Sequence, residues 1–137
     1  MNAPLTGPPP CVLVVDNKHD SADSLALLLG LWGYWAVVAY DGETALAATA
    51  AGEPVAAALI DLALPGMDGY ALVSRLRAMP QLGGAVLIAA TGYGREEDRR
   101  RCLEAGFHHH LLKPYDSMEL RRLLPLGGVL ERGPQRT

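Results

Sequence analysis

Polar side chains of chemically useful types directly follow four apolar runs of the sequence. Asp16 and Asn17 follow the first run, Asp61 the second, Thr91 the third and Lys113 the fourth. If these runs are parallel strands, their carboxyl ends lie together at one edge of a sheet. The sequence therefore predicts a pocket that holds two carboxylates, an amide, a hydroxyl and an ammonium group.

The chemistry of such a pocket concerns metal ions and phosphate. Carboxylate and amide oxygens suit a hard cation such as Mg²⁺, which takes oxygen ligands and keeps several waters. The Asp61 carboxylate is a candidate nucleophile toward phosphorus, which would give an acyl phosphate. Lys113 would pair with one phosphoryl oxygen, and the Thr91 hydroxyl would bond another. Because the chain has two lysines against ten arginines, a lysine at this position is not the compositional default.

The elements that must position this pocket alternate along the chain. Continuous apolar runs at 12–15, 56–60 and 85–90 are typical of parallel strands covered on both faces, whereas 35–39 and 110–112 are weaker strand candidates. Between them, apolar residues at helical spacing predict helices that face the core. Helices are expected around the apolar stripes at 25–32 and 72–79 and over the segments 42–51, 95–105 and 117–124. Asp41, Asp68 and Asp116 are expected as N-caps, and Gly52 and Gly106 as the residues that end helices.

Five such strand–helix units in about 115 residues are too few for a closed eight-stranded barrel. An open α/β sheet with helices on both faces fits better, and its flavodoxin-like version has the strand order 2-1-3-4-5. We therefore expect a single doubly wound (βα)5 domain over residues 11–125. Residues 1–10 form a proline-rich leader or linker, and residues 126–137 form a C-terminal tail.

The composition limits the classes of partner. Twelve lysines plus arginines against 15 aspartates plus glutamates give a formal net charge of −3, and half of the residues are apolar. This balance fits a soluble globular domain and argues against direct nucleic-acid binding or membrane insertion. Cys11 and Cys102 lie far apart without a CxxC spacing, so we expect no zinc site or disulfide, and a cytoplasmic location.

Several other residues invite functional interpretations that we consider weaker. Residues 108–110 are three histidines, but neighbours in a strand point to opposite faces, so their rings would not converge on one metal ion. Residues 99–101 are three arginines, and glutamates four residues before the last two favour ion pairs on a solvated helix. Tyr93 and Tyr115 are interpreted as ordinary packing, with framing of the pocket mouth or of a partner surface as the alternatives.

Four separated blocks of the sequence form a joint pattern, namely Val12–Asp16, Asp61–Gly69, Ala90–Gly92 and Lys113–Pro114. Together they resemble the CheY-like receiver domain of two-component signalling, over about residues 11–124. A finer resemblance, in residues 20–25 and 91–94, is to receivers associated with hybrid sensor histidine kinases. Whether the chain is a stand-alone protein or a piece of a hybrid kinase stays open.

The resemblance implies a role for each pocket residue. Asp61 would be the phosphoacceptor, Asp16 would belong to an acid pocket that holds Mg²⁺, and the Ala63 backbone carbonyl would be a further metal ligand. Most receivers carry an acidic metal ligand where this chain has Asn17. Asparagine keeps an oxygen ligand but removes a charge, so we expect metal binding to weaken by at least about 10–100-fold.

The resemblance also implies a switch. Thr91 and Lys113 would contact the phosphoryl group, and phosphorylation would draw Thr91 inward and rotate the residue three before Lys113, which is His110 here. The face formed by the helix over 95–105, the strand over 110–112 and the helix over 117–124 would then be remodelled. A histidine kinase or histidine phosphotransfer protein would be the phosphodonor, and a homodimer through that face is possible.

The sequence thus favours a phosphoacceptor receiver domain, which is not an enzyme beyond weak self-phosphorylation or dephosphorylation. The alternative is a phosphorylation-independent pseudo-receiver that serves as an interaction module, because Asn17 weakens the metal site. A Mg²⁺-dependent phosphohydrolase is disfavoured. Enzymes of that kind place a second aspartate two residues after the nucleophile, where this chain has Ala63.

Overall fold

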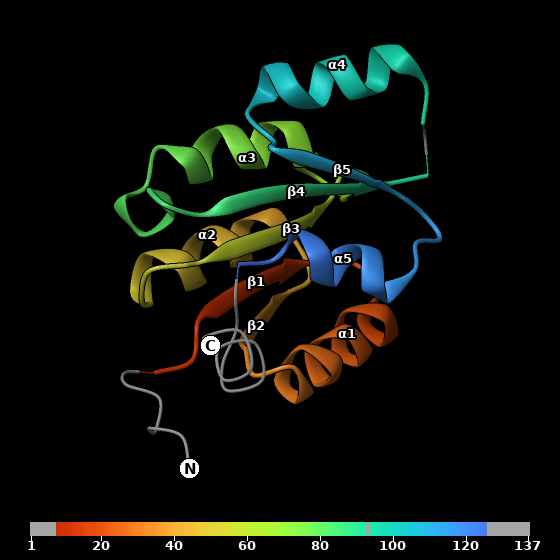
Figure 1. Cartoon of the computed structure of the whole chain (residues 1–137). Coiled ribbons are helices and arrows are strands. Elements are labelled where there is room, and N and C mark those ends of the chain that lie inside the picture. Colours follow the sequence, from red (N-terminus) through yellow and green to blue (C-terminus); the bar gives the residue numbers. More distant parts are fainter. Residues whose placement is uncertain (1–7, 93, 126–137) are drawn as a thin grey trace.

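The computed structural model of the chain describes residues 8–92 and 94–125. Within these residues, five parallel strands form one sheet in the order β2-β1-β3-β4-β5 (Figure 1). The predicted flavodoxin-like topology is therefore confirmed. The strands are β1 Cys11–Val15, β2 Trp35–Ala39, β3 Ala57–Asp61, β4 Val86–Thr91 and β5 His109–Leu112.

Helices alternate with the strands and cover both faces of the sheet (Figure 1). α2, α3 and α4 pack on one face, and α1 and α5 pack on the other. Among the described residues, the α-helices are α1 His19–Leu31, α2 Gly42–Ala51, α3 Gly69–Arg77, α4 Glu96–Ala105 and α5 Ser117–Leu123, and the sequence did not predict a short 3-10 helix, η1 Pro80–Leu82.

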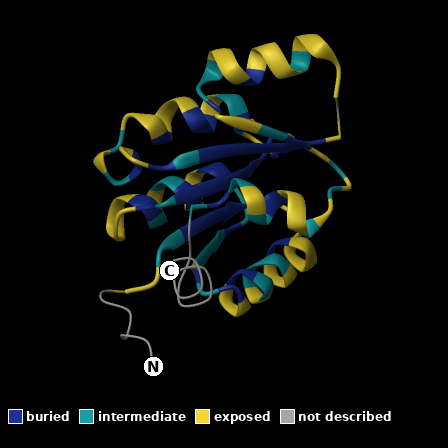
Figure 2. Cartoon of the chain, in the orientation of Figure 1, coloured by how far each residue is buried: buried dark blue, intermediate teal, exposed yellow. Residues whose placement is uncertain are grey.

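The central strands are buried on both faces, which explains their continuous apolar sequences. Successive side chains of a strand point to opposite faces, so both faces of a covered strand need apolar residues. In β1, Leu13 and Val15 pack toward α2, α3 and α4, whereas Val12 and Val14 pack toward α1 and α5. In Figure 2 the buried sheet lies between helices whose outer surfaces are exposed.

Local capping sets where three helices begin. The side chains of Asp41, Asp68 and Asp116 each accept a hydrogen bond from a backbone N–H two or three residues further on. This contact satisfies one of the N–H groups that a helix start leaves without a partner. Gly52 and Gly106 follow the last residues of α2 and α4, as predicted, and Gly106 adopts the left-handed conformation, with φ of 114°.

The boundaries of the strands and the contacts of α4 differ from the expectations. β3 and β4 each extend one residue beyond the apolar run, because backbone pairing continues through a polar residue such as Asp61. The helix expected to reach 79 ends at residue 77. In the described part of α4, the expected glutamate–arginine pairs do not form. Arg95 pairs with Asp98 at 3.3 Å, and Arg101 lies 4.0 Å above the Tyr70 ring.

Between residues 8 and 125, leaving residue 93 aside, no helix combines the length and the apolar character that a bilayer span requires.

Candidate acidic site at the carboxyl edge of the sheet

A cavity of about 470 Å³ opens at the carboxyl edge of the sheet, between the ends of the strands and α1. Asp16 at the end of β1, Asp61 at the end of β3 and Lys113 after β5 all line it. The strand order brings these three residues together, because β1 and β3 are neighbours and β4 and β5 follow at the same side. Residues nearly one hundred positions apart in sequence therefore share one cavity.

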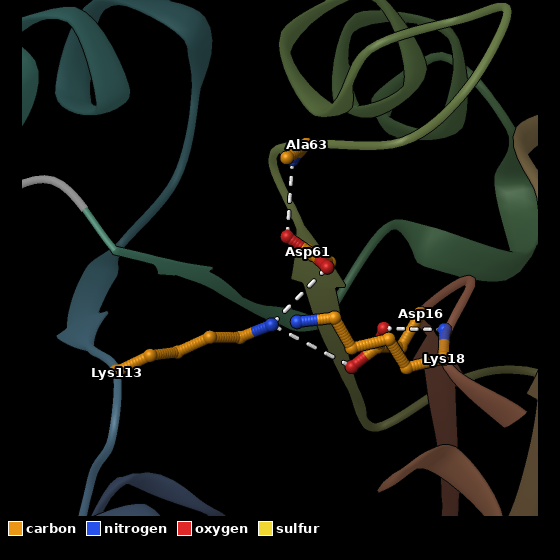
Figure 3. A network of polar contacts seen from close by, with 5 residues as sticks. All are labelled: Asp16, Lys18, Asp61, Ala63 and Lys113. Atoms are coloured by element: carbon orange, nitrogen blue, oxygen red, sulfur yellow. Dashed lines mark hydrogen bonds and ion pairs between the residues drawn. The ribbon is translucent and has the colours of Figure 1, made fainter. Parts of the chain in front are cut away.

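The two carboxylates of this cavity share one ammonium group (Figure 3). Lys113 Nζ lies 3.1 Å from Asp61 Oδ2 and 3.6 Å from Asp16 Oδ2. Each carboxylate also accepts a local backbone hydrogen bond. Ala63 N–H donates to Asp61 Oδ1 at 3.0 Å, and Lys18 N–H donates to Asp16 Oδ1 at 2.9 Å. Both side chains are therefore held in place at their second oxygen.

Asp61 is the one charged residue that is buried in the described part of the chain, with 5% of its surface exposed. An ionised carboxylate in such a position is costly unless it is paired and hydrogen-bonded. The Lys113 ammonium and the Ala63 N–H supply those partners. A carboxylate that is buried, held at both oxygens and open to a cavity has the arrangement expected of a nucleophile.

Tyr115 forms part of the wall of the same cavity. Burial, and after it the negative charges of Asp16 and Asp61, together raise the pKa of its phenol to about 12. The phenol therefore keeps its proton at neutral pH. Ordinary packing was the favoured sequence interpretation of this tyrosine, whereas in the structure it lines the acidic cavity. Tyr93, the other tyrosine considered, lies outside the described residues.

Thr91 lines a second cavity rather than the one that holds Asp16 and Lys113. This neighbouring cavity has a volume of about 250 Å³, and Ala63 and Arg95 also line it. Thr91 is the last residue of β4, is buried, and accepts the Lys113 backbone N–H at its carbonyl oxygen at 2.8 Å. The single pocket that the sequence predicted is therefore divided in two.

Three further residues that the sequence analysis considered lie around this edge. Asn17 is exposed and is not among the residues that line the acidic cavity. His110 lies in β5, and its Nε2 is buried without a hydrogen-bond partner among the described residues. His108 Nδ1 accepts the Leu87 backbone N–H at 2.9 Å, so that imidazole extends the pairing of β4 with β5.

The donor set of the cavity fits a hard divalent cation. Asp16 and Asp61 direct carboxylate oxygens into the same space, and oxygen ligands are those that Mg²⁺ prefers. Among the described residues, no group of three His, Cys, Asp or Glu side chains lies close enough to hold a metal. A cation here would have two carboxylates, and water or neutral oxygens would complete its coordination.

This fold and this edge of the sheet define a receiver of the two-component type. The sequence profile of the response regulator receiver domain matches residues 12–124. The chain therefore belongs to the response regulator receiver domain family.

Individual relatives agree with this assignment. A 14.6 kDa protein of Leptolyngbya boryana is 39% identical over 113 residues, which cover 82% of this chain and 86% of that protein. The sensory transduction protein RegX3 of Mycobacterium tuberculosis is 37% identical over 139 residues, covering 91% of this chain and 59% of RegX3. The sensor histidine kinase RcsC of Escherichia coli is 35% identical over 116 residues, covering 84% of this chain and 12% of RcsC.

Among solved structures, a CheY-like receiver domain protein of Methanospirillum hungatei superimposes with a TM-score of 0.74 at 28% identity. The match covers 82% of this chain and 88% of that one. The chain spans 59% of RegX3 and 12% of RcsC, so the similarity to each concerns only a part of that protein.

Proposed function

We propose that this receiver domain accepts a phosphoryl group on Asp61, from a histidine kinase or a histidine phosphotransfer protein. One observation carries the proposal. The buried Asp61 carboxylate faces a cavity that Asp16 also lines, and the Lys113 ammonium pairs with both carboxylates. As negative charge develops on an incoming phosphoryl group, the Lys113 ammonium would pair with that group in place of the Asp61 carboxylate.

In the proposed transfer, an Asp61 carboxylate oxygen forms a bond to phosphorus as the bond from phosphorus to the donor imidazole nitrogen breaks. The nitrogen keeps the electron pair of the broken bond. The product is an acyl phosphate on Asp61, which is no longer able to ion-pair through the bonded oxygen. Lys113 then pairs with a phosphoryl oxygen, and the neutral Tyr115 phenol closes the wall without adding negative charge.

Asp16, Asn17, Asp61 and the Ala63 carbonyl are the groups that would hold Mg²⁺. When bound, the ion would offset the repulsion between the carboxylates and the phosphoryl dianion. Receiver domains as a class bind Mg²⁺ at the phosphorylation site. The exposed position of Asn17 and its missing charge support the expectation of weak metal binding here.

The proposed output is a change of the face formed by α4, β5 and α5. Thr91 and His110 would couple the acceptor site to this face, since they lie in the two adjacent strands β4 and β5. One large apolar side chain is exposed on each element of the face, namely Leu103, Leu112 and Met118. Exposed apolar groups of this kind suit a protein partner or a second copy of the chain.

The comparisons do not favour the two other functions considered. They give no support to a phosphorylation-independent pseudo-receiver, an idea that depends on Asn17 alone. Receiver domains are a signalling class and not a class of enzymes, and Ala63 supplies no acid or base for a phosphohydrolase.

Intact-protein mass spectrometry after treatment with acetyl phosphate and Mg²⁺ tests the proposal. We expect the mass of one phosphoryl group to be added to the wild type and to be absent from Asp61→Asn. Asp20→Asn is the matched control, since Asp20 is exposed in the first turn of α1 and should leave the labelling unchanged. Equal labelling of Asp61→Asn and the wild type would refute Asp61 as the acceptor.

A further inference from the structure

Both lysines of the chain reach the acidic cavity, although sequence analysis singled out only Lys113. Lys18 lies in the loop after β1 and lines the cavity together with Asp16, Asp61 and Lys113. Figure 3 shows its side chain crossing the cavity so that its ammonium points toward Asp61 and Lys113. Among the described residues, no carboxylate forms an ion pair with this ammonium. Its charge is therefore present in the cavity without being neutralised by direct contact.

The Lys18 ammonium determines the net charge of the cavity lining. The carboxylates of Asp16 and Asp61 face the ammonium groups of Lys18 and Lys113, so the lining is formally neutral. Asn17, next in sequence to Lys18, adds no negative charge. A neutral lining attracts a divalent cation weakly, because the attraction of the cation to the two carboxylates is opposed by its repulsion from the two ammonium groups. The same lining opposes the entry of a phosphoryl dianion less than an acidic lining does.

We propose that Lys18 is a second phosphoryl-binding cation of the acceptor site, which lowers the dependence of Asp61 phosphorylation on Mg²⁺. This inference rests on the proposed function. Lys113 contacts the carboxylates from the side of β5, and the Lys18 side chain comes from the loop after β1 with its ammonium directed toward Asp61 (Figure 3). Both ammonium groups would therefore face a phosphoryl group carried by Asp61. Together they would contact different phosphoryl oxygens.

With acetyl phosphate as donor, the step is balanced without any further reactant. The bond from an Asp61 oxygen to phosphorus forms, and the bond from phosphorus to the acetate oxygen breaks with its electron pair. Acetate leaves, and no net proton is transferred. Lys18 acts only by its charge, which is stabilising as negative charge accumulates on the phosphoryl oxygens.

The inference predicts two changes of opposite sign in Lys18→Met. Removal of a positive charge from the cavity should tighten Mg²⁺ binding by about tenfold, since the ion no longer meets a like charge. The rate of Asp61 phosphorylation in EDTA should fall by about tenfold, since one phosphoryl-binding charge is lost. A merely structural role for Lys18 would not move the two quantities in opposite directions.

The experiment measures Mg²⁺ affinity by isothermal titration calorimetry and the rate of labelling by acetyl phosphate by intact mass spectrometry. Lys18→Arg keeps the charge and should behave as the wild type. Arg100→Met removes one positive charge from an exposed position on α4 and is the matched control for net charge. Lys18 is exposed, so Lys18→Met should fold normally, which a thermal melt checks.

Each outcome separates the inference from the proposed function. Asp61-dependent labelling with equal rates and equal Mg²⁺ affinity in the wild type and Lys18→Met would overturn the inference alone. A change in Mg²⁺ affinity without a change in rate would also overturn it, because phosphoryl binding is then not the role of Lys18. No labelling of any variant at any Mg²⁺ concentration would overturn the proposed function and the inference together.

Discussion

The two edges of the sheet carry cavities of different character. The acidic cavity at the carboxyl edge has a volume of about 470 Å³, and its charged lining residues are two aspartates and two lysines. The cavity at the amino edge is larger, about 650 Å³, and Glu53 is its one charged lining residue. The residues that form the rest of it are mostly apolar, namely Pro8, Pro9, Pro10, Cys11, Trp35, Pro54, Val55 and Ala56.

Volume alone does not single out the acidic cavity, because this apolar cavity is larger, and so is a cavity of about 830 Å³ between the loops after β2 and β3 at the carboxyl edge. All strands of this sheet run in the same direction, so every β-to-α loop meets the same edge and every α-to-β loop meets the other. The last residue of β3 and the residues that directly follow β1 and β5 contribute charged groups that converge. Convergent polar groups, and not volume, separate a site of chemistry from an apolar hollow.

The tight packing of the carboxyl edge gives the largest effect on stability that we predict. Gly69 begins α3, and a Cβ added there would lie 2.8 Å from Leu62 Cα and 3.0 Å from the Asp61 carbonyl oxygen. Backbone atoms cannot move aside as a flexible side chain does, so Gly69→Ala should lower the free energy of unfolding by about 2 kcal/mol. Denaturant unfolding measures this change.

The amino edge offers a matched control for that substitution. Gly84 precedes β4, and nothing lies within 4 Å of a Cβ added there. Gly84→Ala should therefore change the free energy of unfolding by less than about 0.5 kcal/mol. Equal destabilisation by the two substitutions would contradict the packing difference between the edges.

The charges of the carboxyl edge should also be visible in a tyrosine titration. Tyr115 has its pKa raised to about 12 from an ordinary value of 10.0 by burial and then by Asp16 and Asp61. Since the unfolded chain releases this proton at lower pH than the folded chain, stability should decline as the pH rises from 10.0 toward about 12. Tyr115→Phe should reduce that decline in unfolding experiments at alkaline pH.

Asp61→Asn tests the electrostatic part of the same shift. Removal of the Asp61 charge should lower the pKa of Tyr115, followed by tyrosinate absorbance, while burial keeps it above its ordinary value. An unchanged Tyr115 titration in Asp61→Asn would mean that the two groups do not share the cavity.

The smallest effect is expected at the amino edge. The Trp35 side chain is 63% exposed at the start of the edge strand β2. Trp35→Ala should change the free energy of unfolding by less than about 0.5 kcal/mol and leave acetyl phosphate labelling of Asp61 unchanged. A loss of labelling in Trp35→Ala would remove the functional distinction between the two edges.

Much of the framework could be predicted from the sequence because it depends on neighbouring residues. The caps Asp41, Asp68 and Asp116 act on backbone groups two or three positions away, so their roles are visible in the sequence. Continuous apolar runs indicated β1, β3 and β4, since both faces of these strands are covered. The convergence of Asp16, Asp61 and Lys113 followed from the expected strand order.

Other features depend on how distant segments pack. Thr91 ends its strand as expected, yet its side chain belongs to a second cavity with Ala63 and Arg95. The Arg101 side chain lies over Tyr70 of α3 and not beside a glutamate of its own helix. Spacing along one helix does not reveal such competing partners on another helix.

By itself, the sequence determined the type and order of the elements and the identity of the charged groups at one edge, because these follow from side-chain pattern and strand direction. Only the tertiary structure decided which side chains share the acidic cavity. Lys18 and Tyr115 line it, whereas Thr91 does not. The physical reason is that side-chain direction depends on packing between helices and strands that are far apart in the chain, which no local pattern encodes.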